Sequence, residues 1–470
     1  MLGAGPAGLA AAVRLASRDR FDVTVLERAP AVGGNAGSFE LEGLPVDFGS
    51  HRLHPSCPPA ILADIREMLG EDLLLRPRHG RIRLGGRWIH FPLKPLDLAF
   101  GVPPWFAFGV VSDWVRKGAG QDGGGTAGQD RTETFADVLE RGLGRTICRE
   151  FYFPYALKIW GLPPCELDAE QARRRVSAGS VGTLLRKVAS AIPGFRPARQ
   201  GQFYYPRQGF GQISEAYRAR AAALGARVVT GADVQAIAVK GGRVTHAAVG
   251  AGGGESHACD LMLSTIPVPS LVRLFAPPAP DAVITAVRSL RSRAMVLVYL
   301  VLETDRFTEF DAHYFPEPGV RITRVSEPKN YGLTERPGLT VLCAELPCAV
   351  GDEAWQKSTE DLGALVVDAL GAAGLPVRCA VRHVAVRRLP HAYPVYSRGY
   401  RRHLDTVEGW LGAVEGIVTF GRQGLFVHDN THHTLAMAYA AAECVDDEGR
   451  FDGEAWANHR KRFESHVVED

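Results

Sequence analysis

Segments with strand and helix patterns alternate along the chain. Residues 133–188 carry apolar side chains such as Phe135, Val138 and Leu139 at helical spacing, and an alanine-rich helix is predicted from about Thr431. Short apolar runs bounded by glycine, proline or polar residues predict β-strands elsewhere. These strands are expected over residues 21–27, 233–237, 243–244, 259–267, 293–302, 339–346 and 416–420.

This order of elements predicts an α/β protein with more than one domain. A chain of 470 residues exceeds what one hydrophobic core usually serves. We expect a discontinuous Rossmann-like dinucleotide-binding domain from residues 1–75, 200–270 and 400–470. A mainly helical insert over 76–199 and a β-sheet-rich substrate domain over 271–399 would interrupt it. The ligand is expected between these domains, where pockets usually form.

Composition and charge narrow the class of protein. Hydrophobic residues make up 46% and charged residues 23% of the chain, and the net charge is +2, so a nucleic-acid partner is not expected. The sequence has no run of eighteen apolar residues and no charged segment followed by an apolar one at its start, so neither stable membrane insertion nor a signal peptide is expected. Eight cysteines without C-x-x-C spacing favour a reduced, cytoplasmic protein over a disulfide or zinc scaffold.

Two segments of the insert stand out by composition. Residues 100–115 include Trp105, Phe106, Phe108 and Trp114. A helix with buried aromatic side chains is the favoured interpretation, and contact with a membrane surface is the alternative. Residues 118–130, rich in glycine and glutamine, predict an exposed flexible connection.

A glycine-rich turn near the start predicts dinucleotide binding. Gly3, Gly5 and Gly8 form a G-x-G-x-x-G pattern, and Glu27 follows nineteen residues after the last glycine at a strand end. The glycines allow backbone N–H groups to approach a pyrophosphate, and the carboxylate can bind a ribose diol. Only Met1 and Leu2 precede the turn. Either the native start lies further upstream, or some loss of nucleotide affinity is tolerated.

A second glycine pair favours FAD over NAD. Gly33 and Gly34 follow the strand that carries Glu27, and they would let the backbone pass close to the middle of a long cofactor. The arrangement resembles the FAD-binding start of the flavoprotein group that contains amine oxidases, protoporphyrinogen oxidases, phytoene desaturases and UDP-galactopyranose mutases. The resemblance implies FAD as the cofactor.

Three motifs resemble the UDP-galactopyranose mutases in particular. The first is Gly49-Ser50-His51-Arg52-Leu53-His54, in which the resemblance implies that His51 lies beside the flavin. The second is Tyr155 to Gly161, similar to the family's Y-x-x-K-x-W-G stretch, with Arg174 fourteen residues after Trp160. The third is Thr323 to Lys329, similar to T-R-x-x-E-x-K.

These motifs imply substrate-binding roles, each with a structural alternative. Arg174 and Arg324 would bind a diphosphate, since a planar guanidinium makes two charge-assisted bonds at once. The alternatives are a solvated helix face for the three arginines at 173–175, and an ordinary loop histidine for His51. Tyr393, in a Tyr-Pro-Val stretch, is implied to face the substrate, although a buried structural tyrosine fits that position nearly as well.

The C-terminal part resembles the strand-to-helix junction that ends the FAD site. Gly421 and Arg422 match the family's G-R-x-G pattern, and the helix from Thr431 would direct its N-terminus at the flavin. His428 stands where the mutases have a diphosphate-binding tyrosine. His428 and His432 are four residues apart, but no third ligand has suitable spacing, so no metal site is expected.

The resemblance implies two sets of site residues. The catalytic set is His51, Tyr155, Trp160, Arg174, Arg324, Tyr393 and His428. The cofactor-binding set is Gly3, Gly5, Pro6, Ala7, Gly8, Glu27, Arg28, Gly33, Gly34, Asn35, Ala36, Gly49, Ser50, His51, Val234, Gly421, Arg422, Asp429, Asn430 and Thr431.

Three functions follow as hypotheses. The first is a flavoenzyme acting on a small molecule, a sugar linked to a diphosphate or nucleotide, by a mutase reaction of reduced flavin or by hydride transfer. The second is an oxidase or desaturase for an apolar or amine substrate, which the apolar strand over 295–302 favours. The third is a flavin-binding protein without turnover. The sequence leaves the oligomeric state open.

Overall fold

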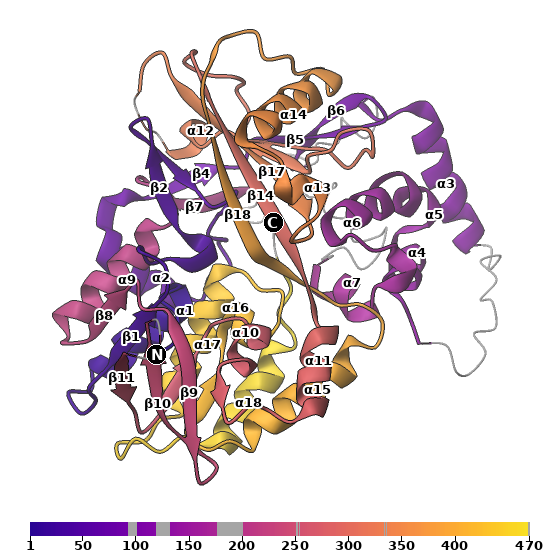
Figure 1. The fold of residues 1–470 in the computed structure, drawn as a ribbon. Coiled ribbons are helices and arrows are strands. Elements are labelled where there is room, and N and C mark those ends of the chain that lie inside the picture. Colours follow the sequence, from indigo (N-terminus) through magenta and orange to yellow (C-terminus); the bar gives the residue numbers. More distant parts are fainter. Residues whose placement is uncertain are drawn as a thin grey trace.

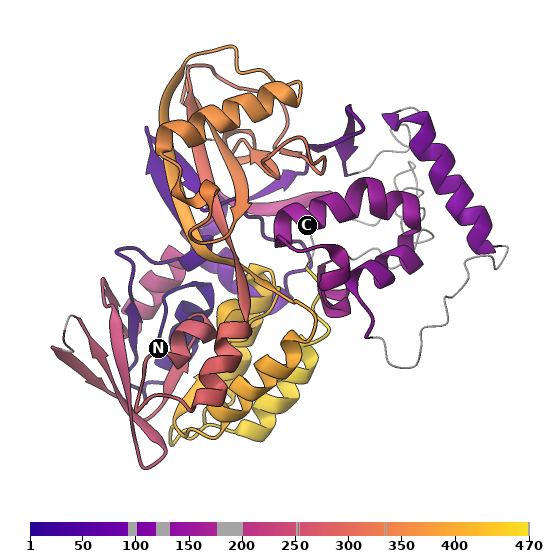
Figure 2. The same cartoon turned by 45° about the vertical axis from the view of Figure 1, so that its right-hand side comes forward.

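The computed structural model describes residues 1–92, 101–118, 132–175 and 201–468, apart from 251, 253, 333 and 335. It has a lower part with a parallel sheet, an upper part with a large mixed sheet, and a group of helices at one side (Figures 1 and 2). The predicted connection over 118–130 and the helical pattern over 176–188 lie almost entirely outside the described residues.

The lower part has the discontinuous Rossmann-like arrangement that the sequence predicts. Its strands run parallel in the order β8, β1, Leu2, β12, β19, because Leu2 bridges both Leu26 and Ser264. The strands are β1 (Thr24–Glu27), β8 (Arg227–Thr230), β12 (Met262–Ser264) and β19 (Ile417–Thr419). The packed helices include α1 (Pro6–Ala16), α2 (Pro59–Leu69), α9 (Gln212–Ala223), α17 (Thr431–Glu443) and α18 (Gly453–Phe463).

A smaller sheet flanks the lower part and extends it beyond the expected boundary at residue 270. The predicted hairpin is present as β9 (Val234–Lys240) and β10 (Arg243–Val249). The other strands are β11 (Glu255–Ala258) and β13 (Phe275–Ala276), and the adjoining helices are α10 (Val268–Val272), α11 (Asp281–Ser289) and α15 (Tyr400–Gly412). Because β13 pairs with β9 and α11 packs on α15, residues 271–289 belong structurally to this part.

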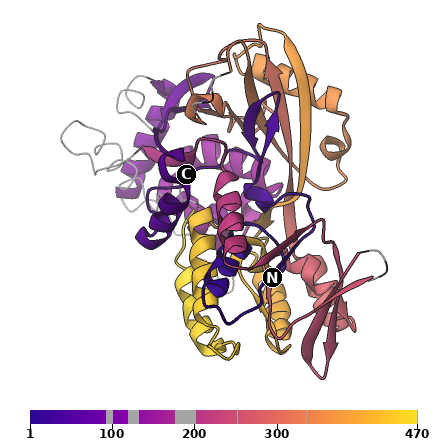
Figure 3. The ribbon, with the colours of Figure 1, turned by 90° about the vertical axis from the view of Figure 1, so that its left-hand side faces the viewer.

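The upper sheet has seven strands in the order β18, β14, β17, β16, β15, β5, β6. They span β18 (Val381–Val395), β14 (Arg291–Leu302), β17 (Thr340–Cys348), β16 (Arg324–Ser326), β15 (Ala312–Tyr314), β5 (Gly80–Leu84) and β6 (Arg87–Phe91). The long strands β14 and β18 run down towards the lower part (Figures 1 and 3). β5 and β6 belong to the insert expected over 76–199, which therefore contributes two strands to this sheet besides its helices.

The sheet is buried on both faces, which explains the continuous apolar run of β14. Val296, Val298 and Leu300 lie in one core with residues of α14 (Thr359–Ala372). Leu297 and Tyr299 lie in another core with residues of the hairpin β2 (Ser38–Leu41) and β3 (Leu44–Asp47). A strand covered on both sides needs no polar alternation. The remaining short elements include η1 (Gly34–Ala36), β4 (Leu73–Pro77), β7 (Gln202–Pro206), α12 (Lys329–Gly332), α13 (Glu353–Gln356) and α16 (Gly421–Gly424).

The helices of the insert share a core with β5 and β6 and expose two aromatic side chains. They are α3 (Pro104–Gly118), α4 (Phe135–Leu143), α5 (Arg145–Ile147), α6 (Phe153–Trp160) and α7 (Ala169–Arg175). Phe106 is buried in this core, as expected, but Trp105 is 52% and Phe108 77% exposed, because they lie on the outer face of α3. No helix in the described ranges is long and apolar enough to cross a membrane.

Candidate active site

The first glycine turn leaves open space beside Gly5 at the N-terminus of α1. Gly3 has a positive φ of 96°, and a Cβ on Gly8 would lie 2.0 Å from the carbonyl oxygen of Gly3, so the turn and the helix are in close contact. A Cβ on Gly5 would meet no atom of the described chain within 4 Å. Space beside the first N–H groups of an eleven-residue helix suits an anionic pyrophosphate.

The second glycine pair faces the first turn. Gly33 has a φ of 109° and donates its N–H to the carbonyl oxygen of Ala4 at 2.8 Å. A Cβ on Gly34 would lie 3.5 Å from the Cα of Gly5. The two glycine-rich turns therefore lie in van der Waals contact with each other.

Glu27 lies at the end of β1 beside the first turn. Its carboxylate accepts hydrogen bonds from the N–H groups of Ala4 at 2.7 Å and Ala29 at 2.8 Å. These bonds fix the strand end against the turn. Val234 begins β9 near this strand end, since Ala232 donates its N–H to the carbonyl oxygen of Glu27 at 2.8 Å. Binding of the ribose by Glu27 remains a prediction.

The C-terminal junction packs against the start of α1 from the other end of the chain. Gly421 has a φ of 75°, and a Cβ there would lie 3.1 Å from the Cβ of Ala7 on α1. Arg422 donates from Nη2 to the carbonyl oxygen of Ala392 at 2.9 Å. Asn35 donates to the carbonyl oxygen of His391 at 2.8 Å, so both glycine-rich segments also hold the end of β18.

His51 is held at the inner face of the upper sheet. Its Nε2 lies 3.0 Å from the carbonyl oxygen of Phe48, and its ring stacks on Phe210 with centroids 5.4 Å apart. Burial lowers the pKa of His51, which keeps the imidazole neutral at pH 7. A neutral ring then donates Nε2–H to Phe48, and this fixes the tautomer.

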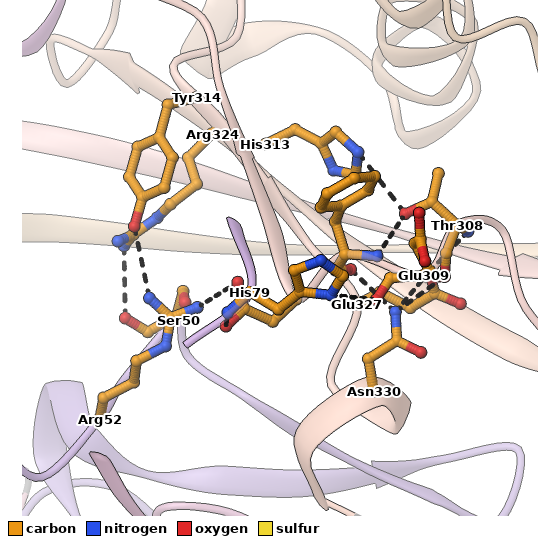
Figure 4. Close-up of polar contacts among 12 residues, drawn as sticks. Ser50, Arg52, His79, Thr308, Glu309, His313, Tyr314, Arg324, Glu327 and Asn330 are labelled. Atoms are coloured by element: carbon orange, nitrogen blue, oxygen red, sulfur yellow. Dashed lines mark hydrogen bonds and ion pairs between the residues drawn. The ribbon is translucent and has the colours of Figure 1, made fainter. Parts of the chain in front are cut away.

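Arg324 is already paired with a buried carboxylate. Its Nε and Nη2 lie 3.0 and 2.6 Å from Oε1 of Glu345. Nη2 also contacts the carbonyl oxygen of Ser50 at 3.3 Å (Figure 4). The Ser50 N–H donates to the same Glu345 oxygen at 3.0 Å. Glu345 raises the pKa of Arg324 against the opposing effect of burial. Binding of a diphosphate by Arg324 therefore remains a prediction, because half of its guanidinium is occupied.

A second buried pair continues this polar layer. Arg52 lies 3.3 Å from Oδ1 of Asp311 through Nη2 and donates from Nη1 to the hydroxyl of Tyr314 at 3.3 Å. The Tyr314 ring lies 5.8 Å from the Arg324 guanidinium carbon. Figure 4 shows Arg52 directed towards the Tyr314 hydroxyl and Arg324 directed towards Ser50.

Three of the predicted residues meet in an aromatic cluster. The Trp160 ring lies 5.6 Å from Tyr393 and 5.1 Å from His428, both edge to face. Arg175 lies over the Trp160 and Tyr393 rings at 5.3 and 5.5 Å, and Arg422 lies over Tyr393 at 5.2 Å. Sequence reasoning named four of these five residues and passed over Arg175.

Arg174 points to a different part of the molecule. Its Nε donates to Glu170 at 2.8 Å, and its Nη1 donates to the carbonyl oxygen of Phe463 at 3.2 Å. Its own carbonyl oxygen accepts the N–H of Val468 at 2.8 Å. Successive helical residues point about 100° apart, so only one of two adjacent arginines can face the cluster. The motif spacing alone could not distinguish them.

His428 is buried in the cluster and is neutral. Its Nε2 lies 3.0 Å from the side-chain nitrogen of Gln171 on α7. Burial, together with the cationic Arg175 and Arg422, lowers the pKa of His428 well below its usual value. A neutral ring can accept the Gln171 amide hydrogen.

Two other motif residues have structural contacts. The Tyr155 ring lies 6.0 Å from that of Phe151. Lys158 on α6 donates from Nζ to the carbonyl oxygens of Phe315, Glu317 and Ile322. These bonds hold the loop between β15 and β16 against α6. The catalytic role of Tyr155 stays a prediction.

Comparison with known proteins places this chain in a family. The profile described as flavin containing amine oxidoreductase matches residues 6–418. A reduced UDP-galactopyranose mutase has the same fold, with a TM-score of 0.80 and 19% identity over 99% of this chain and 97% of that chain. A comparison with curated protein sequences finds no match.

Two further solved structures have the same fold. A putative protoporphyrinogen oxidase from Exiguobacterium sp. 255-15 has a TM-score of 0.69 and 20% identity over 94% of this chain and 97% of that chain. Putrescine oxidase bound to putrescine has a TM-score of 0.65 and 19% identity with the same coverage. At such identities the likeness establishes the fold and not a shared substrate.

Proposed function

This chain belongs to the family of flavin containing amine oxidoreductases and has FAD as its cofactor, and we propose that it acts on a sugar bearing a diphosphate or nucleotide. The observation that carries the proposal is the charge around Tyr393. Burial and the nearby Glu345 raise the pKa of the Tyr393 phenol. The guanidinium groups of Arg175, Arg324 and Arg422 all lie close enough to lower it in opposition.

Two of the three cations around Tyr393 form no ion pair with a carboxylate in the described residues. Glu345 pairs with Arg324, whereas Arg175 and Arg422 make no ion pair with any carboxylate in the described parts of the chain. Burial lowers the pKa of Arg422, which means that the cation is poorly solvated there. A diphosphate would offset this cost and accept bidentate hydrogen bonds from both guanidinium groups.

The same charges disfavour an amine substrate. Two like unit charges about 5 Å apart repel by roughly 3 kcal/mol at an effective dielectric constant of 20. An ammonium group placed on the faces of Trp160 and Tyr393 would compete with Arg175, which already lies over both rings.

The cofactor would bind at the two glycine turns, where Gly5 leaves open space. Gly5, Gly8, Gly33 and Gly34 would hold the pyrophosphate, and the start of α17 would face the flavin. When bound, FAD supplies hydride-transfer chemistry, or nucleophilic chemistry in its reduced form. Arg175 and Arg422 would then bind and orient the diphosphate, while the packed rings of Trp160, Tyr393 and His428 exclude water from it.

Turnover of a nucleotide sugar tests the proposal. FAD-loaded protein is reduced chemically and incubated with UDP-galactofuranose, and the pyranose form is separated and quantified. We expect conversion that requires reduced flavin and is lost in R175A. R173A is the matched control for R175A. Arg173 lies on the same helix, two residues before Arg175, but pairs with Glu133 on the exposed face. Failure of reduced wild-type protein to convert the sugar contradicts the mutase reaction.

One observation favours the second candidate function, oxidation of an apolar or amine substrate. The edge-to-face packing of Trp160 with Tyr393 and His428 provides apolar walls beside the cationic groups. The assay is oxygen consumption by oxidised, FAD-loaded protein with putrescine. Turnover with putrescine but not with the nucleotide sugar would replace the first candidate by the second.

A further inference from the structure

A surface cavity lies where the helical insert meets α11 and α15 of the lower part. Its volume is about 460 Å³, which falls in the range of sites that bind small molecules. In Figure 1, α11 and α15 lie side by side below α7. Leu162 is the only apolar side chain among the described residues that line the cavity. The cavity therefore suits a polar ligand.

Contacts between distant segments of the chain build this cavity. Arg398 donates its backbone N–H to the carbonyl oxygen of Glu166 in the insert at 2.9 Å. Arg291 begins β14 and pairs with Val395 of β18, three residues before Arg398. Arg288 lies in the last turn of α11, which packs on α15. Arginines from three separate elements thus line one cavity.

These three arginines have no counterion in the described parts of the chain. The side chains of Arg288, Arg291 and Arg398 form neither an ion pair nor a hydrogen bond among the described residues. By contrast, Arg401 in the first turn of α15 pairs with Asp405 at 2.8 Å. Like charges gathered in one cavity repel each other, so a bound anion would stabilise this arrangement.

Charge and donor geometry indicate the class of anion. Glu166 is the only carboxylate among the described lining residues, so three guanidinium groups and one carboxylate give the cavity a net charge of +2. Nε2 of His403 accepts a hydrogen bond from Nε of Arg402 at 3.3 Å, so this histidine is neutral and its Nδ1–H can donate. A phosphate monoester carries about −1.5 to −2 charges at pH 7 and has three acceptor oxygens that point in different directions. A planar carboxylate matches neither this charge nor three guanidinium groups from separate elements.

We propose that the cavity binds a small molecule carrying a phosphate monoester, with Arg288, Arg291 and Arg398 as its charged ligands. This site is distinct from the proposed diphosphate site, because none of its lining residues belongs to the cluster of rings and arginines around Tyr393. It would exist whether or not the protein acts on a nucleotide sugar. The confined volume favours a small molecule over a nucleic acid.

Two lining segments continue into the aromatic cluster. Leu162 follows Trp160 by two residues, and Arg398 follows Tyr396 by two residues. The N–H of Tyr396 donates at 3.1 Å to the side chain of Gln171, the residue of α7 that also contacts the cluster. A ligand bound to both segments would hold them together beside the cluster.

Site-resolved modification of FAD-loaded wild-type protein tests the proposal. Phenylglyoxal, which reacts with arginine side chains, is added with or without glycerol 3-phosphate at constant ionic strength, and modified peptides are quantified by mass spectrometry. We expect glycerol 3-phosphate to slow the modification of Arg288, Arg291 and Arg398, whereas glycerol should not. Arg306 is the internal control, because it is also exposed and lies beyond the opposite end of β14.

Binding affinity tests the same arginines individually. Glycerol 3-phosphate is titrated calorimetrically into FAD-loaded wild type, R288Q, R398Q and R306Q. Loss of one charge-assisted hydrogen bond should weaken binding at least about ten-fold in R288Q and R398Q, while R306Q should bind as wild type does. All three substituted arginines are exposed, so the variants should fold, and flavin absorbance and thermal unfolding check this.

The wild-type arm decides the matter even if a variant fails to fold. Equal modification rates of the three cavity arginines with and without glycerol 3-phosphate overturn the proposal. Equal slowing at Arg306 overturns it as well, because the anion then binds exposed arginines without selection. Unchanged affinity in folded R288Q and R398Q would show that the phosphate binds elsewhere.

Discussion

Replacement of Gly5 by alanine separates the cofactor site from the fold. Gly5 has φ −73° and ψ 176°, a conformation that alanine adopts without strain. A Cβ at this position would meet no atom of the described chain within 4 Å. The G5A protein should therefore fold, and only a ligand that uses this space should be affected.

The expected magnitudes have opposite signs. A glycine-to-alanine change in a compatible conformation reduces the freedom of the unfolded chain and stabilises the apoprotein by about 0.4–1 kcal/mol. The added methyl group lies where the pyrophosphate approaches the start of α1, so the FAD dissociation constant should rise at least about ten-fold, or ~1.4 kcal/mol.

Two measurements test this combination. Urea unfolding of the apoprotein gives the change in stability, and titration of apoprotein with FAD, followed by flavin fluorescence, gives the affinity. The reasoning is refuted if G5A binds FAD as tightly as wild type, or if the apoprotein loses stability.

Three other predictions follow from separate contacts. G8A should destabilise the apoprotein and weaken FAD binding together, because its Cβ would lie 2.0 Å from the Gly3 carbonyl oxygen; unchanged urea unfolding would contradict this. E345Q should lower the free energy of unfolding by about 3 kcal/mol or more, since it leaves the Arg324 cation buried without its charge partner, and thermal or urea unfolding measures the loss. Burial and the nearby Arg81 lower the pKa of His313 to about 3. As pH drops from about 6 to 3, the histidine is protonated in the unfolded chain but not in the folded protein, so the free energy of unfolding falls. H313Q should remove up to about 1.4 kcal/mol per pH unit of that slope, and an equal slope in both proteins would refute it.

The nucleotide-binding part could be predicted from sequence because its signals are local. Gly3, Gly5 and Gly8 act within one turn, and strand and helix follow from adjacent residues. The upper sheet was only partly foreseen, because the hairpin of β5 and β6 joins it through the pairing of β5 with β15, a strand more than two hundred residues away. Such pairing leaves no mark in the spacing of the short strands themselves.

The site shows the same limit. Trp160, Tyr393 and His428 were named from motifs, and the structure brings them together. The choice between Arg174 and Arg175 depends on the rotation of α7 relative to β18, which no motif encodes. Likewise, Arg288, Arg291 and Arg398 line one cavity only because α11 packs on α15 and β14 pairs with β18, so their positions in the sequence could not reveal it.

Calorimetric titration with UDP tests the central claim most directly. FAD-loaded wild type, R175A and R173A are titrated with UDP and, separately, with uridine. The account predicts that wild type binds UDP but not uridine with appreciable affinity, that R175A binds UDP at least about ten-fold more weakly, and that R173A behaves as wild type. Equal affinity of R175A and wild type for UDP, or no binding of UDP by wild type, would contradict a diphosphate site at Tyr393.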